Sequence, residues 1–529
     1  MSLSDIHRLQ ESIAEPLLMG FDCPLFSSFR FLEEHFPGAS PAVHRAFSIA
    51  RMAGCHTLGI EIITPIGLLA DDNEELYKYE GKCLDPIFRI SFWGTVYFAG
   101  ITAQSLDSEK LLGYAIIKRD LGTCKQTGNQ IDRWYVFEAL FRNESLYVSF
   151  GSFINSYKVR ACSHECIIHG VLYCQQNGIN KCCAHVALIT LLSRIMLGND
   201  ISYKTINQYA EFASSSDRFC PGAGLCLEQI RHVLWLSGVC FEEYDARSMS
   251  KDYSYQKCIY DGVESGIGSL LFIAYGEPKN TARHVLPVYG HTFNSNTWVP
   301  DADSSYFMMG DGVGYMPSDL WTGDFVGHDD NFGCNFCIPR KHIAEQNAYH
   351  AIALHKPREK LNAMQAEKVS LYLLSSWAPH LDRHNLWNNQ IIQLLSPGST
   401  SLIPPRFVFR TVTVSAKEYI DEISKVTDGR GNAENPSVIA ALSLMGLPDR
   451  LMVVEVSLPQ LFPANKHKIG EFVFDATQLG DIDVLKMVST VFCFGRMPGE
   501  YLYFDNNQLD RPLVRRKSKL VDHTRLLYT

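Results

Sequence analysis

Residues 176–187 read QNGINKCCAHVA, and the apolar segment LITLLSRIM follows at 188–196. From residue 184 onward nearly every position is apolar, which is typical of a helix buried on all sides in a core. The helix is expected to begin near Cys182, just after the turn-like segment 177–181. A helix N-terminus presents unpaired N–H groups and the positive end of the helix dipole, and both favour a thiolate. The stretch therefore predicts a core helix with a reactive Cys182 at its start.

Gln176 lies six residues before Cys182, where its side-chain amide can join the backbone N–H of Cys182 as a donor to an oxyanion. The spacing resembles that of papain-like cysteine peptidases, closest to the bacteriocin-processing peptidase domains of ABC transporters and their relatives, in four residues: Gln176, Cys182, Ala184 and Ala187. This resemblance implies that Cys182 is the nucleophile and Gln176 the oxyanion donor. It also implies an α+β fold with a papain-like core, in which the nucleophile helix packs on an antiparallel sheet.

The neighbouring Cys183 is the alternative nucleophile. Counted from Cys183, the residues AHVAL at 184–188 fit a looser form of the same peptidase pattern, but the position six residues earlier then holds Asn177 instead of glutamine. A pair of cysteines in an apolar helix is also typical of simple packing, because cysteine is among the most buried residue types. The spacing favours Cys182 and leaves Cys183 open.

A thiol nucleophile needs a base that is distant in sequence and close in space. Residues 283–290 read RHVLPVYG, which places His284 at the start of a predicted strand that ends in glycine. Residues 291–301 (HTFNSNTWVPD) predict a turn and a return strand that ends on Asp301. Asp301 would then lie beside His284, accept its Nδ1–H and fix its tautomer, with Asp303 in reserve. The predicted triad is Cys182, His284 and Asp301.

Two other groups of residues have donors for a metal but the wrong spacing for a common zinc site. One is a single CxxC pair, Cys334 and Cys337, which follows the polar loop HDDNFG at 328–333; that loop is expected to line the cleft. The other contains Cys162, His164, Cys166, His169 and Cys174. No phosphate-binding or dinucleotide-binding glycine motif follows a predicted strand. The sequence therefore predicts neither a metal nor a cofactor.

Three regions differ in their pattern along the chain. Residues 1–155 predict helices at 29–36 and 41–53 and then short strands, which together indicate an α+β region. Residues 156–345 hold the nucleophile helix, two further helices at 203–212 and 224–237, and strands at 270–274, 285–289 and 297–299, and form the predicted hydrolase domain. Residues 346–529 predict a second α+β domain, with helices at 360–376 and 437–445 and strands at 406–414 and 451–456.

The composition excludes several classes of protein. Of the 529 residues, 46% are hydrophobic and 20% are charged, which is typical of a globular chain. The formal net charge of −9 gives no basic field for nucleic acid, and no uninterrupted apolar segment is long enough to predict a membrane span. The first twenty residues lack the apolar centre of a signal peptide, and the 16 scattered cysteines do not suggest a disulfide scaffold, so a cytoplasmic location is expected.

The leading functional hypothesis is an intracellular cysteine peptidase that forms a thioester acyl-enzyme on a protein or peptide substrate. A second hypothesis keeps the thiol and changes the acceptor, giving an acyltransferase, a deamidase or a transglutaminase-like enzyme. A third keeps only the fold, as a catalytically silent binding module. The sequence does not indicate the substrate or the oligomeric state.

Overall fold

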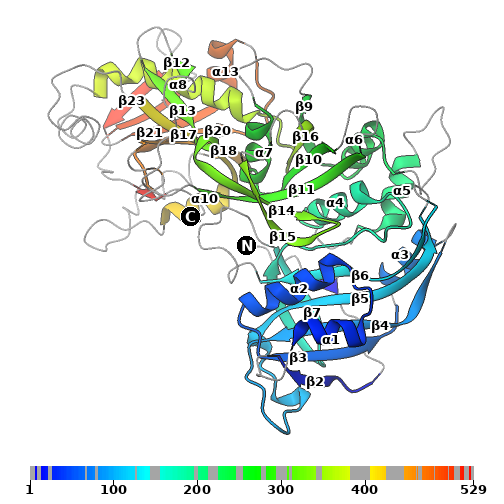
Figure 1. The fold of residues 1–529 in the computed structure, drawn as a ribbon. Coiled ribbons are helices and arrows are strands. Elements are labelled where there is room, and N and C mark those ends of the chain that lie inside the picture. Colours follow the sequence, from blue (N-terminus) through cyan, green and yellow to red (C-terminus); the bar gives the residue numbers. More distant parts are fainter. Residues whose placement is uncertain are drawn as a thin grey trace.

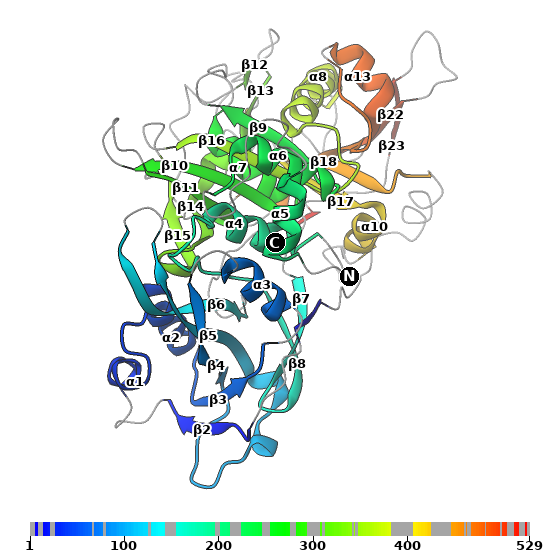
Figure 2. The same ribbon diagram turned by 90° about the vertical axis from the view of Figure 1, so that its right-hand side faces the viewer.

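The computed structural model describes most of the chain. The described residues are 6–8, 14–21, 27–65, 68–77, 81–124, 128–142, 155–195, 201–211, 224–245, 254–275, 282–293, 307–308, 313–340, 343, 348–381, 406–424, 446–459, 462, 467–481, 483–497, 500–504, 513–517 and 524–525. Three larger sheets follow one another through the molecule, from the blue N-terminal region to the orange and red C-terminal region (Figures 1 and 2).

The N-terminal sheet is a five-stranded antiparallel meander in sequence order. Its strands are β2 (Leu17–Gly20), β3 (Thr57–Ile63), β4 (Lys82–Trp93), β5 (Leu111–Thr123) and β6 (Gln130–Phe141). Helices α1 (Ser28–His35) and α2 (Pro41–Met52) cover one face, where Ile90, Ala115 and Val136 lie in their core. Both faces are buried, because neighbouring strand residues such as Tyr114 and Ile116 point into a different core on the other side.

Smaller elements surround this sheet. Helix α3 (Leu68–Tyr77) lies between β3 and β4 in sequence. A three-stranded sheet joins β1 (Ile6–Arg8), β7 (Asn155–Ala161) and β8 (His164–Gly170), with β1 and β7 parallel and β7 and β8 antiparallel.

The middle sheet is six-stranded and antiparallel throughout, in the order β15-β14-β11-β10-β16-β9. Its strands are β9 (Cys240–Asp245), β10 (Gly268–Tyr275), β11 (Ala282–Phe293), β14 (Thr322–Asp329), β15 (Gly333–Pro339) and β16 (Ala348–His355). Helix α4 (Cys183–Leu192) packs on one face and helix α7 (Tyr255–Glu264) on the other. The strand β10 is apolar at nearly every position because its residues alternate between these two cores.

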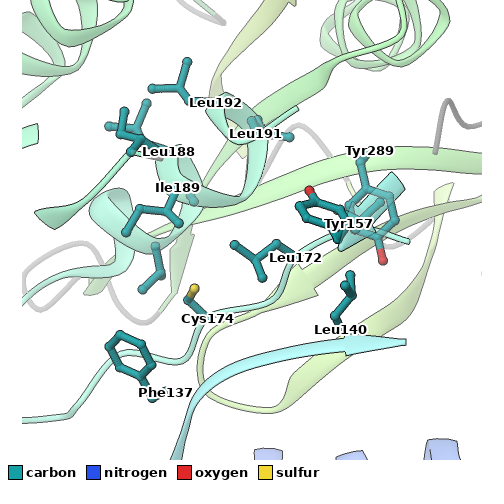
Figure 3. Close-up of a cluster of buried hydrophobic side chains, with 14 of the residues drawn as sticks. Phe137, Leu140, Tyr157, Leu172, Cys174, Leu188, Ile189, Leu191, Leu192 and Tyr289 are labelled. Carbon is teal, nitrogen blue, oxygen red and sulfur yellow. The ribbon is translucent and has the colours of Figure 1, made fainter. Parts of the chain in front are cut away.

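Two further helices, α5 (Tyr203–Glu211) and α6 (Leu227–Leu236), complete the core around α4. Figure 3 shows side chains of α4, among them Leu188 and Leu191, in one cluster with Phe137 of the N-terminal sheet and Tyr289 of β11. The N-terminal sheet and the middle sheet thus share a core. The predicted limit at residue 155 falls within one continuous packed unit.

The C-terminal sheet has eight strands in the order β12-β13-β17-β18-β20-β21-β22-β23. Its later strands are β17 (Arg406–Ser415), β18 (Arg450–Ser457), β20 (Gly470–Asp475), β21 (Phe492–Met497), β22 (Glu500–Phe504) and β23 (Leu513–Lys517), and its helices are α8 (Ala363–Leu381), α10 (Ala416–Ser424) and α13 (Val484–Val491). The short strands β19 (His467–Lys468) and β24 (Thr524–Arg525) pair with each other.

The predicted limit at residue 345 does not separate the strands of the middle sheet from those of the C-terminal sheet. The strands β12 (Phe307–Met308) and β13 (Gly314–Pro317) precede this limit in sequence, yet β13 pairs in parallel with β17 of the C-terminal sheet. The strand β16 follows the limit and pairs with β10 of the middle sheet. The middle and C-terminal regions are therefore interleaved.

Buried charges join these two regions. The guanidinium of Arg410 on β17 is 2.8 Å from both Glu264 of α7 and Glu455 of β18, and all three side chains are almost fully buried. Glu264 also lies 2.8 Å from His291 of β11. Because buried ions are costly without partners, this set fixes α7 against the C-terminal sheet.

An α+β fold with antiparallel sheets agrees with the expectation from sequence. The long periodic segments were predicted well: the helix expected at 41–53 is α2, that expected at 203–212 is α5, and the strand expected at 406–414 is β17. The segments 146–150, 297–299 and 437–445 lie outside the described residues. Within the described part of the chain, no helix combines the length and the hydropathy needed to cross a bilayer.

Candidate active site

The helix α4 begins at Cys183, one residue later than expected, with Cys182 as its N-cap residue. The side-chain oxygen of Asn177 accepts hydrogen bonds from the backbone N–H groups of Ile179 and Asn180, both at 3.0 Å, and so fixes the turn that leads into the helix. The first intrahelical bond runs from the N–H of Val186 to the carbonyl of Cys182. The N–H of Cys183 precedes that bond and lies at the positive end of the helix.

Three reactive side chains meet at this helix start. The sulfur of Cys183, a ring nitrogen of His284 and a carboxylate oxygen of Asp330 all lie within 4.8 Å of one another. Cys183 is partly exposed, whereas His284 and Asp330 are buried. The structure therefore brings His284 to the predicted helix and pairs it there with Cys183.

Two neighbouring strands of the middle sheet carry the histidine and its acid. His284 lies near the beginning of β11, and Asp330 directly follows the end of β14. These strands are antiparallel, with Val288 opposite Gly327, so the end of β14 lies beside the beginning of β11. Nε2 of His284 is 3.0 Å from a carboxylate oxygen of Asp330 and 3.6 Å from one of Asp329. Both carboxylates thus face the same ring nitrogen.

The turn between β14 and β15 holds these acids in place. A side-chain oxygen of Asp329 accepts hydrogen bonds from the backbone N–H groups of Asn331, at 2.8 Å, and Phe332, at 3.2 Å. The hydroxyl of Tyr173 donates to the carbonyl of Asp329 at 3.2 Å. The turn is therefore fixed by side chains inside and outside the hairpin.

The surroundings of His284 favour its charged form. Burial lowers the pKa of the imidazole, but its contacts with Asp329, Asp330 and Cys183 outweigh burial and raise the pKa to about 12. Burial raises the pKa of Asp329, yet the contact with His284 and the N–H groups of Asn331 and Phe332 outweigh burial and lower that pKa. Burial is the main cause that raises the pKa of Asp330. At neutral pH the site therefore contains an imidazolium beside Cys183.

Cys182 lies in a different environment. Its side chain is only 2% exposed and belongs to the core shared by the N-terminal and middle sheets. Burial raises the pKa of the Cys182 thiol to about 12, although the backbone of Asn177 and the hydroxyl of Tyr203 lower it. A thiol of this kind stays protonated at neutral pH and is inert. The geometry therefore gives no support to Cys182 as the nucleophile and favours the alternative, Cys183.

Gln176 is connected to the acid turn. Its side-chain nitrogen donates to the side-chain oxygen of Asn331 at 2.8 Å, and the side-chain nitrogen of Asn331 donates to Asp330 at 3.3 Å. The neighbouring Gln175 is used elsewhere, since its side-chain oxygen accepts bonds from Ser40 and from the backbone N–H of Val136 in the N-terminal region. Gln176 is thus linked through Asn331 to Asp330, the acid that lies beside His284.

Asp301 and Asp303, the acids expected from the sequence, lie outside the described residues. Among the described residues, β14 pairs with β11 on this side; it ends at Asp329 and is followed by Asp330. The polar loop at 328–333 was predicted to line the cleft, but its acids were not assigned to the histidine. The sequence signal for Asp329 and Asp330 was a turn with two aspartates between two segments whose apolar and polar residues alternate as in strands.

The group of cysteines and histidines at 162–174 has separate partners. His164 lies 2.8 Å from the carbonyl of Ala103, and His169 lies 2.8 Å from the hydroxyl of Ser156. Among the described residues, Cys183, His284 and Asp330 form the group of three donors close enough to hold a metal ion. Thiolate, imidazole and carboxylate are ligands that zinc accepts.

His185 is a packing residue. It is buried in α4, lies 2.8 Å from the side-chain oxygen of Asn207 and stacks on Tyr203. Burial lowers its pKa to about 4, so it remains neutral.

Comparisons with protein-family profiles, with curated proteins and with solved structures find no match for this chain. The function must therefore be inferred from the site itself.

Proposed function

We propose that this protein is a cysteine peptidase with a papain-like core, whose nucleophile is Cys183, whose base is His284 and whose orienting acid is Asp330. The observation that carries the proposal is the position of these three side chains within 4.8 Å of one another at the start of α4. Nucleophilic catalysis by cysteine requires a thiol next to a base that a third group orients, and the three side chains offer these groups at a helix start.

The fold around the site supports this assignment. A buried helix begins with the thiol and packs on an antiparallel sheet, and the first residues of the strand β11 supply the histidine. A papain-like core would have this arrangement. The third member would then be Asp330 on the neighbouring strand end, with Asp329 as a second negative charge.

The chemistry follows from the charges. An imidazolium favours a neighbouring thiolate, and the dipole of α4 adds to this effect. The thiolate of Cys183 attacks the carbonyl carbon and forms a C–S bond, and the carbonyl oxygen becomes an oxyanion. When the C–N bond breaks, His284 gives its proton to the leaving amine. Water then attacks the thioester, His284 takes a proton from it, and the thiolate leaves. In this proposal Asp330 orients the imidazole from its position 3.0 Å from Nε2.

Two donors are proposed for the oxyanion. One is the backbone N–H of Cys183, which precedes the first intrahelical hydrogen bond. The other is the side-chain amide of Gln176, which is attached to the acid turn through Asn331. Gln176 keeps the role expected from the sequence, with the nucleophile moved by one residue.

The same acyl-enzyme serves an acyltransferase, a deamidase or a transglutaminase-like enzyme, and only the acceptor differs. Product analysis with peptide substrates, in the presence and absence of added amines, separates these reactions from hydrolysis. A silent binding module would show no turnover and no enhanced reactivity of Cys183.

A zinc centre is a second candidate, and the closeness of the three donor atoms favours it. Metal analysis of the purified protein, together with labelling before and after a chelator, distinguishes the two. Stoichiometric zinc whose removal exposes Cys183 would support the metal centre, and efficient labelling without a chelator would support the hydrolase.

The proposal is tested with a thiol-directed activity probe at neutral pH. We expect wild-type protein to be labelled at a single cysteine, Cys183→Ala and His284→Ala to lose labelling, and Cys182→Ala to keep it. Mass spectrometry of the labelled peptide identifies the sulfur. Labelling that is lost in Cys182→Ala and kept in Cys183→Ala would overturn the assignment and restore the nucleophile expected from the sequence.

A further inference from the structure

The hairpin of β14 and β15, which carries the two acids, contains a bulge. Gly327 pairs with Phe336 and Asp329 pairs with Gly333, so one residue of β14, His328, lies opposite two residues of β15, Cys334 and Asn335. A bulge of this kind leaves ladder groups unpaired and changes the direction of nearby side chains. Here it lies directly beside the turn that aims Asp330 at His284.

Arg45, on helix α2 of the N-terminal region, binds both bulged residues. Its Nε donates to the carbonyl of Cys334 at 3.3 Å, and its Nη2 donates to the carbonyl of Asn335 at 2.8 Å. The guanidinium carbon also lies 4.9 Å from the centre of the Phe336 ring. One planar side chain thus holds two carbonyls and an aromatic ring, which suits arginine and not lysine. Figure 1 shows α2 next to β15.

Asn335 transmits this contact to the acid strand. It adopts the left-handed conformation, with φ of 54°, which asparagine tolerates better than most residues. Its backbone N–H donates to Nδ1 of the buried His328 at 3.1 Å, and its side-chain oxygen accepts from the hydroxyl of Tyr289. His328 is the residue before Asp329. The path from α2 therefore consists of direct hydrogen bonds to His328, followed by one peptide bond to Asp329 and a second to Asp330.

The helix and the hairpin also approach closely beside Arg45. A Cβ added at Gly333 would lie 2.8 Å from the side chain of Arg45 and 3.3 Å from the Cα of Ala42, and Gly333 has φ of 123°. The side chain of Cys334 lies in the core under α1 and α2. The start of β15 is thus packed into the N-terminal region by shape as well as by hydrogen bonds.

We propose that Arg45 is a positioning residue for the catalytic acid: helix α2 holds the bulge of β15 through Arg45, and the bulge directs Asp330 toward His284. The N-terminal region then acts as part of the catalytic apparatus. This inference rests on the proposed function, because it assigns a role to Arg45 in the reactivity of Cys183.

The test measures the rate of alkylation of Cys183 by iodoacetamide between about pH 6 and pH 9 in the full-length protein, together with its thermal unfolding. If the acid moves away, the pKa of His284 falls toward its ordinary value of about 6.5, so we expect Arg45→Ala to lower the rate at about pH 7.5 by about tenfold. At pH 9 the rate should change much less, since the thiolate then forms without the imidazolium. A merely structural loosening would not produce this dependence on pH.

Three variants complete the test. Arg45→Lys, which keeps the charge and loses the planar fork, should fall between wild type and Arg45→Ala. Gly333→Ala, which pushes the hairpin away from α2 without removing a charge, should reproduce the loss at about pH 7.5. Arg51→Ala is the matched control: Arg51 is on the same helix, contacts Ser28 and the ring of Phe21 in the N-terminal region, and should leave the pH profile unchanged.

The outcomes separate the two proposals. The role of Arg45 is overturned if wild-type Cys183 is reactive and the folded variants have the same pH profile as wild type. Those variants are Arg45→Ala, Arg45→Lys and Gly333→Ala, and in that case the proposed function stands. A wild type in which Cys183 reacts no faster than an ordinary exposed thiol overturns the proposed function, and the role of Arg45 with it.

Discussion

Nε2 of His284 lies 3.0 Å from the carboxylate of Asp330, and this contact joins the first residues of β11 to the end of β14. It places a carboxylate against Nε2 of the imidazole. It also places two carboxylates and one imidazole in a largely buried site, where their charges interact strongly. The predictions on the site follow from this contact.

Asp330→Asn should reduce the reactivity of Cys183 near neutral pH. The carboxamide carries no charge, so the pKa of His284, which Asp330 helps to raise, should fall. A fall of one pKa unit corresponds to about a tenfold change in the population of the imidazolium when the pH exceeds the pKa. We expect the NMR titration of the His284 ring to move to lower pH, and alkylation by iodoacetamide to slow at about pH 7.5, above the ordinary pKa of histidine.

Asp329→Asn is the matched control for that variant. Its remaining side-chain oxygen can still accept the N–H groups of Asn331 and Phe332, and Asp329 lies farther from Nε2, at 3.6 Å. The loss should be smaller than in Asp330→Asn. A larger loss in Asp329→Asn would make Asp329 the orienting acid.

The stability of the protein should depend on pH through His284. Its pKa is raised in the folded protein by Asp329, Asp330 and Cys183, so the folded state binds the proton more tightly than the unfolded chain. This contribution is complete below the unfolded pKa of about 6.5 and is lost gradually as the pH rises toward the folded value. The difference in free energy of unfolding between wild type and His284→Gln should therefore be largest near pH 6 and smaller at about pH 9.

Denaturant unfolding of both proteins at the two pH values measures this difference. A difference that grows from pH 6 to pH 9 would show that the neutral imidazole is the form stabilised by folding, and would contradict the charged site.

The sequence predicted the helix and the histidine because both carry strong local signals. The apolar segment after Cys183 can only be a buried helix, and His284 opens a strand with a clear apolar pattern. Successive side chains of a helix point in directions about 100° apart. Of the two adjacent cysteines, Cys182 and Cys183, only one can therefore face the histidine. In the structure the helix starts one residue later than expected, and it is Cys183 that lies within 4.8 Å of His284 and Asp330.

The pairing of β11 with β14 could not be predicted because β14 comes late in the sequence. Residues 294–321, between β11 and β14, include β12 and β13, which join the C-terminal sheet and not the middle sheet. A local hairpin was the simplest expectation, and strand pairing over a longer separation leaves no periodic signal. The role of Arg45 depends on contacts across 289 and 290 residues of sequence, which no local pattern records.

Gln176→Ala should affect acylation and leave alkylation unchanged. An oxyanion forms when the thiolate attacks a carbonyl but not when it displaces iodide, so the loss of one donor should slow only the first reaction. For acylation by p-nitrophenyl acetate we expect a loss of about 10²-fold to 10³-fold, as for other oxyanion donors. Iodoacetamide provides the internal control in the same variant. Equal losses in both reactions would assign Gln176 to the support of the acid turn through Asn331 and not to the oxyanion.

Arg410→Met should strongly destabilise the contact between α7 and the C-terminal sheet. The guanidinium is the shared partner of Glu264 and Glu455, and its removal leaves two buried carboxylates with less compensation. Breaking a buried ion pair in this way costs about 3–5 kcal/mol, which denaturant unfolding measures directly.

The matched control is Arg119→Ala, because Arg119 is likewise paired with a carboxylate, that of Asp132 at 2.7 Å, but on an exposed surface. The control should shift the unfolding midpoint little. Similar midpoints for the two variants would mean that the buried pair is solvated or replaceable, and that α7 is held mainly by its apolar face.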